Sequence, residues 1–186
     1  LGFDPGRTDW ARFSGSGDKV ARLPKGGTPC LYNLVGDCIT PGPVVVAEGE
    51  IDALHAASLH FPAVTGTGGA GTWKKAWSAT IAQIEQAQAH GVVICYDGDD
   101  AGRRGAQKVA RSLHAVGLDV RIATLPDERD VNDVLRDGGR LALEALIEAA
   151  EAYRPPDDAP DPDPQYPQYP QNPQNPENGR AGHTWQ

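Results

Sequence analysis

The sequence lacks several features that mark common protein classes. It has no methionine, and its three cysteines, Cys30, Cys38 and Cys95, are odd in number and do not have the C-x-x-C spacing of zinc ribbons. No stretch approaches the roughly 20 apolar residues that span a bilayer, no signal-peptide pattern opens the chain, and no P-loop Gly-Lys-Ser/Thr is present. These absences disfavour a secreted disulfide scaffold, a membrane protein and a P-loop ATPase, and they favour a reducing cytoplasm. A chain that starts at Leu1 without any methionine is also typical of a piece of a longer protein.

Charge and composition divide the 186 residues into three segments. The formal net charge is -8, although the first part of the chain carries a basic cluster of Lys19, Arg22 and Lys25. Pro41-Gly42-Pro43 interrupts regular structure, and from residue 151 the chain is acidic and then rich in Pro, Gln and Asn. We therefore predict a basic lead-in (1–42), one α/β core domain (43–150) and a disordered tail (151–186).

Apolar runs alternate with helical patterns through the core. Strands are predicted near residues 19–23, 30–35, 44–47, 63–64, 92–96 and 119–125, and helices over 51–60, 73–88, 101–116 and 141–150. This alternation predicts a parallel sheet of about four strands with helices on both faces, a Rossmann-like layout. In the first helix, Ile51, Leu54 and Leu59 share one face.

Helix 101–116 has a clear division between polar and apolar faces. Val109, Leu113 and Val116 are expected to turn toward the sheet. The basic side chains of the other face are Arg104, Lys108 and Arg111.

Two acidic clusters come directly after predicted strands. The segment V-V-V-A-E-G-E-I-D carries Glu48, Glu50 and Asp52, and V-V-I-C-Y-D-G-D-D carries Asp97, Asp99 and Asp100. Parallel strands bring such side chains to one edge of the sheet, where carboxylate oxygens suit Mg²⁺. Any single carboxylate here could instead cap a helix, which is the simplest account of Glu50 and Asp100. Because crowded carboxylates repel one another unless a cation neutralises them, Glu48, Asp97 and Asp99 together predict a divalent-metal site.

A glycine-rich segment offers a competing interpretation. Gly66-Thr67-Gly68-Gly69-Ala70-Gly71 satisfies G-x-G-x-x-G before a predicted helix, as in dinucleotide-binding domains. The preceding strand is weak, however, and this hypothesis leaves Glu48 and Asp99 unexplained. In the metal-site hypothesis the backbone N–H groups of Gly68 and Gly69 are available to phosphate oxygens.

Three motifs in order resemble the Toprim domain of DnaG-type primases and phage primase-helicases. They are E-G-E-I-D-A-L, Y-D-G-D-D-A-G-R-R-G-A and L-P-D-E-R-D-V-N-D-V-L, and the resemblance covers residues 44–137. It implies that Glu48 acts as general acid or base or helps to hold metal, and that Asp97 and Asp99 are D-x-D ligands of Mg²⁺ or Mn²⁺. Asp52 and Asp130 match further acidic positions, while Asn132 and Asp133 are weaker candidates.

The resemblance also implies an activity and partners. It predicts metal-dependent synthesis of short RNA primers from nucleoside triphosphates on single-stranded DNA, together with a fused or separate replicative helicase. K-V-A-R-L-P-K-G-G-T-P-C-L-Y-N-L resembles the segment that precedes Toprim in phage primase-helicases. The candidate contacts to nucleic-acid or nucleotide phosphates are Lys19, Arg22, Lys25, Gly68, Gly69, Lys74, Arg104 and Lys108, with simple solvation as the alternative for the basic side chains.

Two other functions remain open at this level. The same carboxylates and metal would serve a Toprim nuclease, which cleaves a phosphodiester instead of forming one. A non-catalytic module that binds nucleotide or single strands and recruits a helicase is the other alternative. A topoisomerase is disfavoured because Tyr153, Tyr166 and Tyr169 lie in or near the predicted tail.

Overall fold

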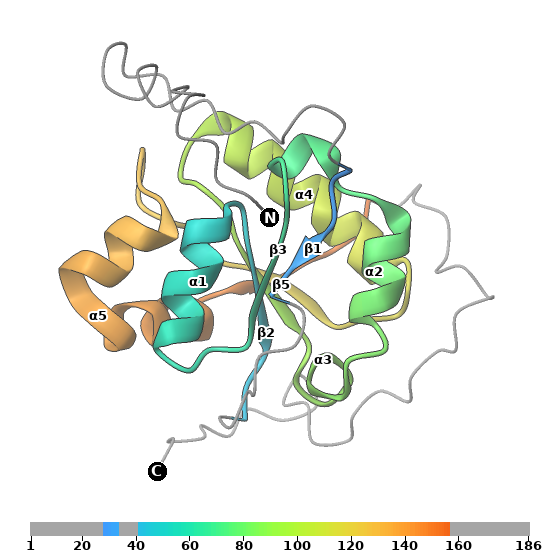
Figure 1. Ribbon diagram of the computed structural model, residues 1–186, viewed down its shortest axis with the longest axis horizontal. Coiled ribbons are helices and arrows are strands. Elements are labelled where there is room, and N and C mark those ends of the chain that lie inside the picture. Colours follow the sequence, from blue (N-terminus) through green and yellow to red (C-terminus); the bar gives the residue numbers. More distant parts are fainter. Residues whose placement is uncertain (1–27, 34–40, 157–186) are drawn as a thin grey trace, which may run out of the picture.

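A six-stranded mixed sheet forms the centre of the molecule, in the order β1-β3-β2-β4-β5-β6 (Figure 1). The computed structural model describes residues 28–33 and 41–156. The four inner strands are mutually parallel: β3 (Ala63–Gly66), β2 (Val44–Ala47), β4 (Val92–Cys95) and β5 (Val120–Ile122). Two short antiparallel strands, β1 (Leu31–Tyr32) and β6 (Glu151–Ala152), form the edges. The predicted parallel sheet of about four strands is therefore confirmed, with an added strand on each side.

The sequences of β2 and β4 explain why these strands lie at the centre. Val-Val-Val-Ala and Val-Val-Ile-Cys are buried at every position, as expected for strands covered on both faces. The register pairs Val44 with Val92 and Ala47 with Cys95, so the two strands end at the same level. Glu48 and Asp97 consequently leave the sheet at the same edge.

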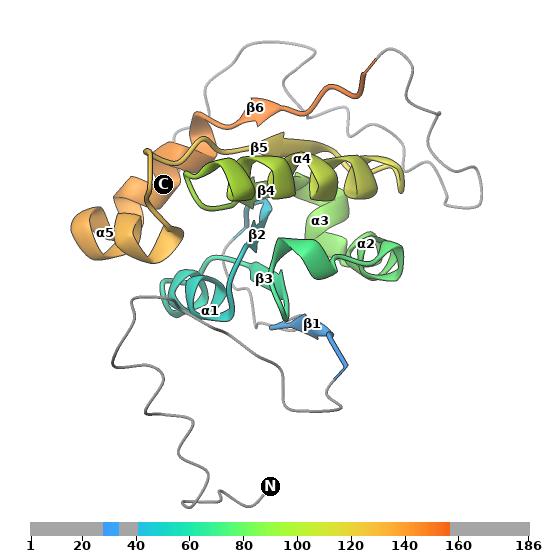
Figure 2. The ribbon, with the colours of Figure 1, turned by 90° about the horizontal axis from the view of Figure 1, so that it is seen from above.

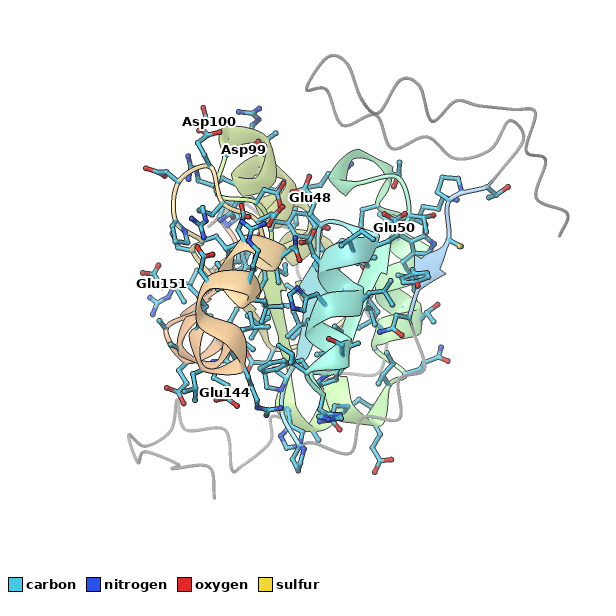
Figure 3. All side chains as sticks on the ribbon, turned by 60° about the vertical axis from the view of Figure 1, so that its left-hand side comes forward. Glu48, Glu50, Asp99, Asp100, Glu144 and Glu151 are labelled. Carbon is cyan, nitrogen blue, oxygen red and sulfur yellow. The ribbon has the colours of Figure 1, made fainter. Side chains whose placement is uncertain are left out.

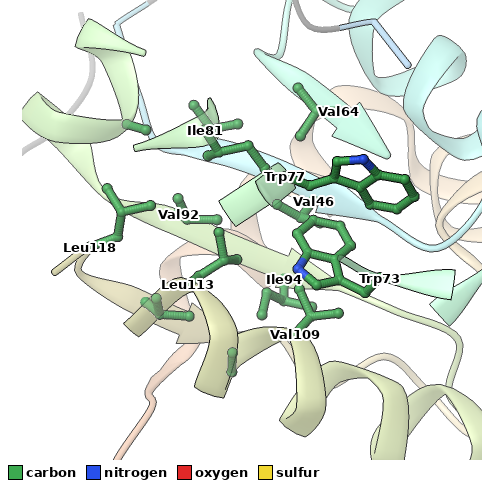
Figure 4. Close-up of a cluster of buried hydrophobic side chains, with 14 of the residues drawn as sticks. Val46, Val64, Trp73, Trp77, Ile81, Val92, Ile94, Val109, Leu113 and Leu118 are labelled. Atoms are coloured by element: carbon green, nitrogen blue, oxygen red, sulfur yellow. The ribbon is translucent and has the colours of Figure 1, made fainter. Parts of the chain in front are cut away.

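Helices cover both faces of the sheet (Figures 1 and 2). Alternate residues of β2 point to opposite faces, so that Val44 and Val46 belong to one hydrophobic cluster and Val45 and Ala47 to another. The first cluster packs under α2 (Lys75–Ile81), α3 (Glu85–His90) and α4 (Asp100–His114). Figure 4 shows its central side chains, among them Trp73, Trp77 and Leu113. The second cluster packs under α1 (Glu50–Ser58) and α5 (Val131–Glu148).

Helix α4 has the predicted orientation, whereas α1 does not. Val109 and Leu113 are fully buried against the sheet. On α1, by contrast, Ile51 is 66% exposed and Leu54 43% exposed. The buried face of α1 consists of small residues and Asp52 instead, because α1 packs closely against both α5 and β3.

Several element boundaries also differ from expectation. The predicted helix 73–88 is two helices, α2 and α3, and α5 begins at Val131 instead of 141, with non-helical backbone at Gly139 (φ 59°). β1 comes from the predicted lead-in and β6 from the predicted tail, so the sheet extends beyond 43–150 on both sides. The division into three segments stays a prediction, and the strand predicted near 19–23 lies outside the described residues.

Within the described ranges, no helix combines the length and apolar character that crossing a membrane requires.

The burial of α4 predicts a large stability effect at one leucine. Leu113→Ala should lower the free energy of unfolding by about 2–5 kcal/mol, because the side chain is fully buried and its removal leaves a cavity. Urea denaturation followed by circular dichroism measures this loss. Leu141→Ala is the matched control, since Leu141 is 77% exposed and should change stability by less than about 0.5 kcal/mol. Equal losses in the two variants would contradict the packing of α4.

Candidate metal centre at the carboxyl edge of the sheet

Glu48 and Asp97 meet across the ends of β2 and β4. The backbone N–H of Asp97 donates a hydrogen bond to Oε2 of Glu48 over 3.4 Å. Behind them, the buried hydroxyl of Thr65 on β3 donates to the backbone carbonyl of Glu48 over 3.1 Å. Three adjacent parallel strands therefore position the Glu48 carboxylate beside the Asp97 backbone.

The turn between Asp97 and Asp99 is held by the loop that precedes α5. Gly98 N–H donates to the carbonyl of Arg129 (2.8 Å), and Glu128 N–H donates back to the carbonyl of Gly98 (3.3 Å). The approach is so close that a Cβ at Gly98 would overlap the carbonyl oxygen of Pro126. Glycine is needed here because the backbones of the second and third motifs touch.

Arg103 adds a side-chain link to the same turn. Its Nη1 donates to the carbonyl of Gly98 over 2.7 Å and lies 3.3 Å from Oδ1 of Asp127. Sequence reasoning did not single out Arg103, Thr65 or Arg129. The available signal was the position of Arg103 inside the second motif, four residues after Asp99.

Asp99 is the N-cap of α4 as well as a candidate ligand. Its Oδ1 accepts a hydrogen bond of 2.6 Å from the backbone N–H of Gly102. Gly102 is also constrained, because a Cβ there would overlap the carbonyl oxygen of Asp97. The helix-capping alternative is therefore realised at Asp99, while Asp100 and Glu50 lie in the first turns of α4 and α1.

Asp52 and Asp130 both act on the N-terminus of α5. Asp130 is its N-cap and accepts from the N–H of Asp133 over 2.6 Å. Asp52 reaches across from α1 and accepts from the N–H of Asn132 over 3.0 Å. The side chain of Asn132 is in turn hydrogen-bonded to His55 over 2.7 Å. These contacts tie the first motif to the third.

The five predicted carboxylates lie close enough to repel one another. Burial, followed by the charges of the other four, raises the pKa of Asp97 from 3.8 to about 7. The other four are Glu48, Asp52, Asp99 and Asp130. Burial also raises the pKa of Glu48, an effect that the Asp97 N–H opposes and that Asp99 and Asp52 reinforce. Figure 3 shows Glu48, Asp99 and Asp100 at the same end of the sheet, far from Glu144.

This donor set suits a hard divalent cation. All five side chains offer oxygen, and their mutual repulsion is the kind that a cation relieves. In the described part of the chain, however, no three His, Cys, Asp or Glu side chains are arranged as a ready set of ligands for one ion. Mg²⁺ keeps several waters and needs few carboxylates besides substrate phosphates, so the arrangement fits an open site better than a closed structural one. The assignment of individual ligands stays a prediction.

The residues predicted to contact phosphate differ in their positions and in the partners that they already have. Gly68 and Gly69 both adopt positive φ (93° and 76°) in the loop after β3, and Lys108 Nζ reaches the carbonyl of Gly71 over 3.3 Å. Lys74 Nζ instead bonds the carbonyl of Pro29 and lies over the Trp77 ring. Arg104 is exposed on α4. Lys19, Arg22 and Lys25 lie outside the described residues.

The glycine-rich segment does not form the start of a helix. β3 ends at Gly66, a short 3₁₀ turn covers Ala70–Thr72, and α2 begins only at Lys75, with Lys74 as its N-cap. A dinucleotide fingerprint needs its glycines to lead directly into the helix whose N-terminus binds the pyrophosphate. The geometry therefore disfavours the dinucleotide-binding hypothesis.

Comparison with known proteins agrees with the geometry. A family model described as Toprim-like matches residues 45–135. The Gene 57 protein of Mycobacterium phage D29 is 31% identical over 134 residues, which are 72% of this chain and 81% of the relative. The DNA helicase/primase of Enterobacteria phage T3 is 37% identical over 93 residues, which are 48% of this chain and 16% of that protein. The solved catalytic core of the Escherichia coli primase is 29% identical, with a TM-score of 0.53, and the match covers 66% of this chain and 39% of that one.

Fold and site together define a Toprim-type α/β domain. The chain belongs to the Toprim family, in the form found in DnaG-type primases. It spans most of its phage D29 relative but well under half of the E. coli catalytic core and of the T3 protein.

The raised pKa of Asp97 predicts an unusual pH dependence of stability. The folded protein without metal retains a proton that the unfolded chain releases above pH 3.8, so stability should fall as pH rises from about 4 to about 7. Asp97→Asn removes this cost and should raise the free energy of unfolding at pH 8 by about 1–2 kcal/mol, because water screens part of the effect at this half-buried position.

Chemical denaturation in EDTA at pH 4, 6 and 8 tests this expectation. The advantage of Asp97→Asn should vanish near pH 4 and shrink when saturating Mg²⁺ stabilises the wild type. Asp100→Asn serves as the control, since the Asp100 side chain is 84% exposed. A pH-independent difference between Asp97→Asn and the wild type would refute the assignment of the raised pKa.

Proposed function

We propose that this chain is the catalytic Toprim part of a primase, which joins ribonucleotides into short primers on a single-stranded DNA template. The observation that carries the proposal is the convergence of four carboxylates on a fifth, that of Asp97, at the carboxyl edge of the sheet. Relatives that are named as primases support it. Because the chain covers only part of these relatives, template reading and other steps belong to the whole protein.

The proposed roles follow from the contacts. Glu48 is partly buried, and burial raises its pKa, which suits a side chain that exchanges a proton with a nucleotide hydroxyl. Asp97 and Asp99, supported by Asp52 and Asp130, would hold Mg²⁺ or Mn²⁺. Bound there, the metal would supply positive charge to hold the triphosphate and offset the charge that develops during phosphoryl transfer.

The contacts around the carboxylates explain how the fold would hold them in position for catalysis. The Asp97 N–H orients Glu48, the carbonyl of Gly98 is held by Arg103, and Asp99 is fixed by capping α4. The carboxylates of Glu48 and Asp99 are thus held by backbone hydrogen bonds before substrate arrives, and Asp97 starts the turn that Arg103 holds. Such preorganisation is what a phosphoryl-transfer site requires.

A helicase is the expected protein partner. The T3 relative is named as a DNA helicase/primase, so the two activities occur together in a protein with a matching domain. We infer that the present chain works beside a replicative helicase, either fused to it or bound to it. Co-purification with the helicase encoded by the same replicon would test this partner.

Removal of either central carboxylate should abolish metal-dependent turnover. Glu48→Gln and Asp97→Asn should each lower primer synthesis by at least about 100-fold, because they remove a proton-transfer group and a metal ligand respectively. The assay supplies labelled ribonucleoside triphosphates and a single-stranded template with Mg²⁺, with Mn²⁺ or with EDTA. Glu85→Gln on α3, near the amino ends of the strands, is a matched control and should retain activity.

The same reaction mixtures distinguish the competing functions. Metal-dependent shortening of the template without primers would establish the nuclease instead. Normal primer yield from Asp97→Asn would contradict the catalytic proposal, as would the absence of any Mg²⁺ or Mn²⁺ uptake in calorimetric titration of the wild type.

A further inference from the structure

The two faces of the sheet carry opposite charge. The helices on one face, α2, α3 and α4, contain two acidic residues, Glu85 and Asp100, and the following basic residues: Lys75, Arg103, Arg104, Lys108 and Arg111. On the other face, α1 and α5 contain two basic residues, Arg136 and Arg140, and the following acidic ones: Glu50, Asp52, Asp133, Asp137, Glu144 and Glu148. Figure 1 shows α2 and α4 on one side of the sheet and α1 and α5 on the other. A chain of net charge -8 therefore has one cationic face.

The basic side chains of the two faces also differ in whether they form ion pairs with acidic side chains. On α5, Arg136 pairs with Asp133 and Arg140 pairs with Glu144. On the other face, the side chains of Lys75, Arg104 and Arg111 are exposed and form no hydrogen bond or ion pair with any other residue that the structure describes. Neutralised arginines serve the fold, whereas exposed, unneutralised ones remain free for an external anion.

The cationic row begins beside the acidic centre and leads away from it. Asp99 caps α4, and Arg104, Lys108 and Arg111 follow on one side of this helix over a rise of about 10 Å. Lys108 touches the carbonyl of Gly71, so the row also borders the glycine-rich loop. An anionic chain lying along α4 would thus reach the carboxylate cluster at one end of the helix.

We propose that the surface formed by Arg104, Lys108 and Arg111, here called the α4 track, binds the phosphate backbone of a single-stranded nucleic acid and leads it to the acidic centre. This inference rests on the proposed function and adds a path for the strand. Phosphates, not bases, are the contacted groups, since Trp73 and Trp77 beneath this face are buried and unavailable for stacking. Binding should accordingly tolerate any base sequence and weaken steeply with salt.

Strand binding in the absence of metal tests the track separately from catalysis. Fluorescence anisotropy of a labelled oligo-dT of about 20 nucleotides is measured with the full chain in EDTA over a range of salt concentrations. Arg104→Gln/Arg111→Gln should raise Kd about 10-fold near 0.1 M salt, and the slope of log K against log salt should fall by about 1.4, or 0.7 for each lost phosphate contact.

A second double variant controls for the change in net charge. Arg136→Gln/Leu141→Glu also lowers the charge by two, but on α5, where both side chains are exposed, and it should change Kd less than twofold. The track is overturned if Arg104→Gln/Arg111→Gln binds within twofold of the wild type, or if the control loses as much affinity. Competition by polyglutamate as effective as that by oligo-dT would also overturn it, in favour of an acidic protein partner.

The variant Asp97→Asn distinguishes failure of the catalytic proposal from failure of the α4 track. It should lose primer synthesis while retaining strand affinity in EDTA. Inactivity of Asp97→Asn together with unchanged binding by the α4 variant would leave the proposed function intact and remove the track. Loss of binding by the α4 variant, without any metal-dependent synthesis in the wild type, would support the track and contradict the proposed function.

Discussion

Repulsion among carboxylates at one edge of the sheet is the constraint on which the rest of the structure depends. The register of β2 against β4 ends both strands at the same level and forces Glu48 and Asp97 together. Burial then makes their charges costly, as the raised pKa of Asp97 shows. A fold without a use for this edge would gain stability by placing amides or apolar groups there. The cost is consistent with a site built to receive positive charge.

The surrounding contacts hold these charges in place against their repulsion. Gly98 is bonded on both sides to the loop before α5, and Asp52 joins α1 to the start of that helix. Capping by Asp99 and Asp130 directs the N-termini of α4 and α5 toward the cluster, where the partial positive charges of the helix ends offset some of the negative charge. Asp99 caps α4 and still belongs to the carboxylates whose charges act on Asp97, so the two explanations offered by the sequence, helix capping and metal binding, do not exclude each other.

The sequence predicts the centre of this structure better than its margins. Uninterrupted β-branched runs identify β2 and β4, and the acidic residues after them mark the edge of the sheet because strand direction fixes where side chains emerge. The two-residue strands β1 and β6 have no periodicity to reveal them. The last helix was predicted to begin only at residue 141, whereas α5 begins at Val131 and passes through Gly139 with a kink. The large apolar side chains also predicted the wrong buried face of α1, because close packing there favours Ala53 and Ala56 over Ile51.

The side-chain contacts that connect the motifs could not be predicted from the sequence for a related reason. The contacts of Arg103 with Asp127, and of Asp52 with Asn132, join motifs that lie far apart in the sequence, and they depend on how closely the α5 loop approaches the D-G-D turn. The division of charge between the two faces is likewise invisible until the topology assigns each helix to a face. Once assigned, it is consistent with the two proposals, in which the carboxyl edge would hold a cation and α4 would bind a polyanion. Because α4 starts at Asp99, one helix connects both, so the metal and the strand would be brought together without any movement of the core.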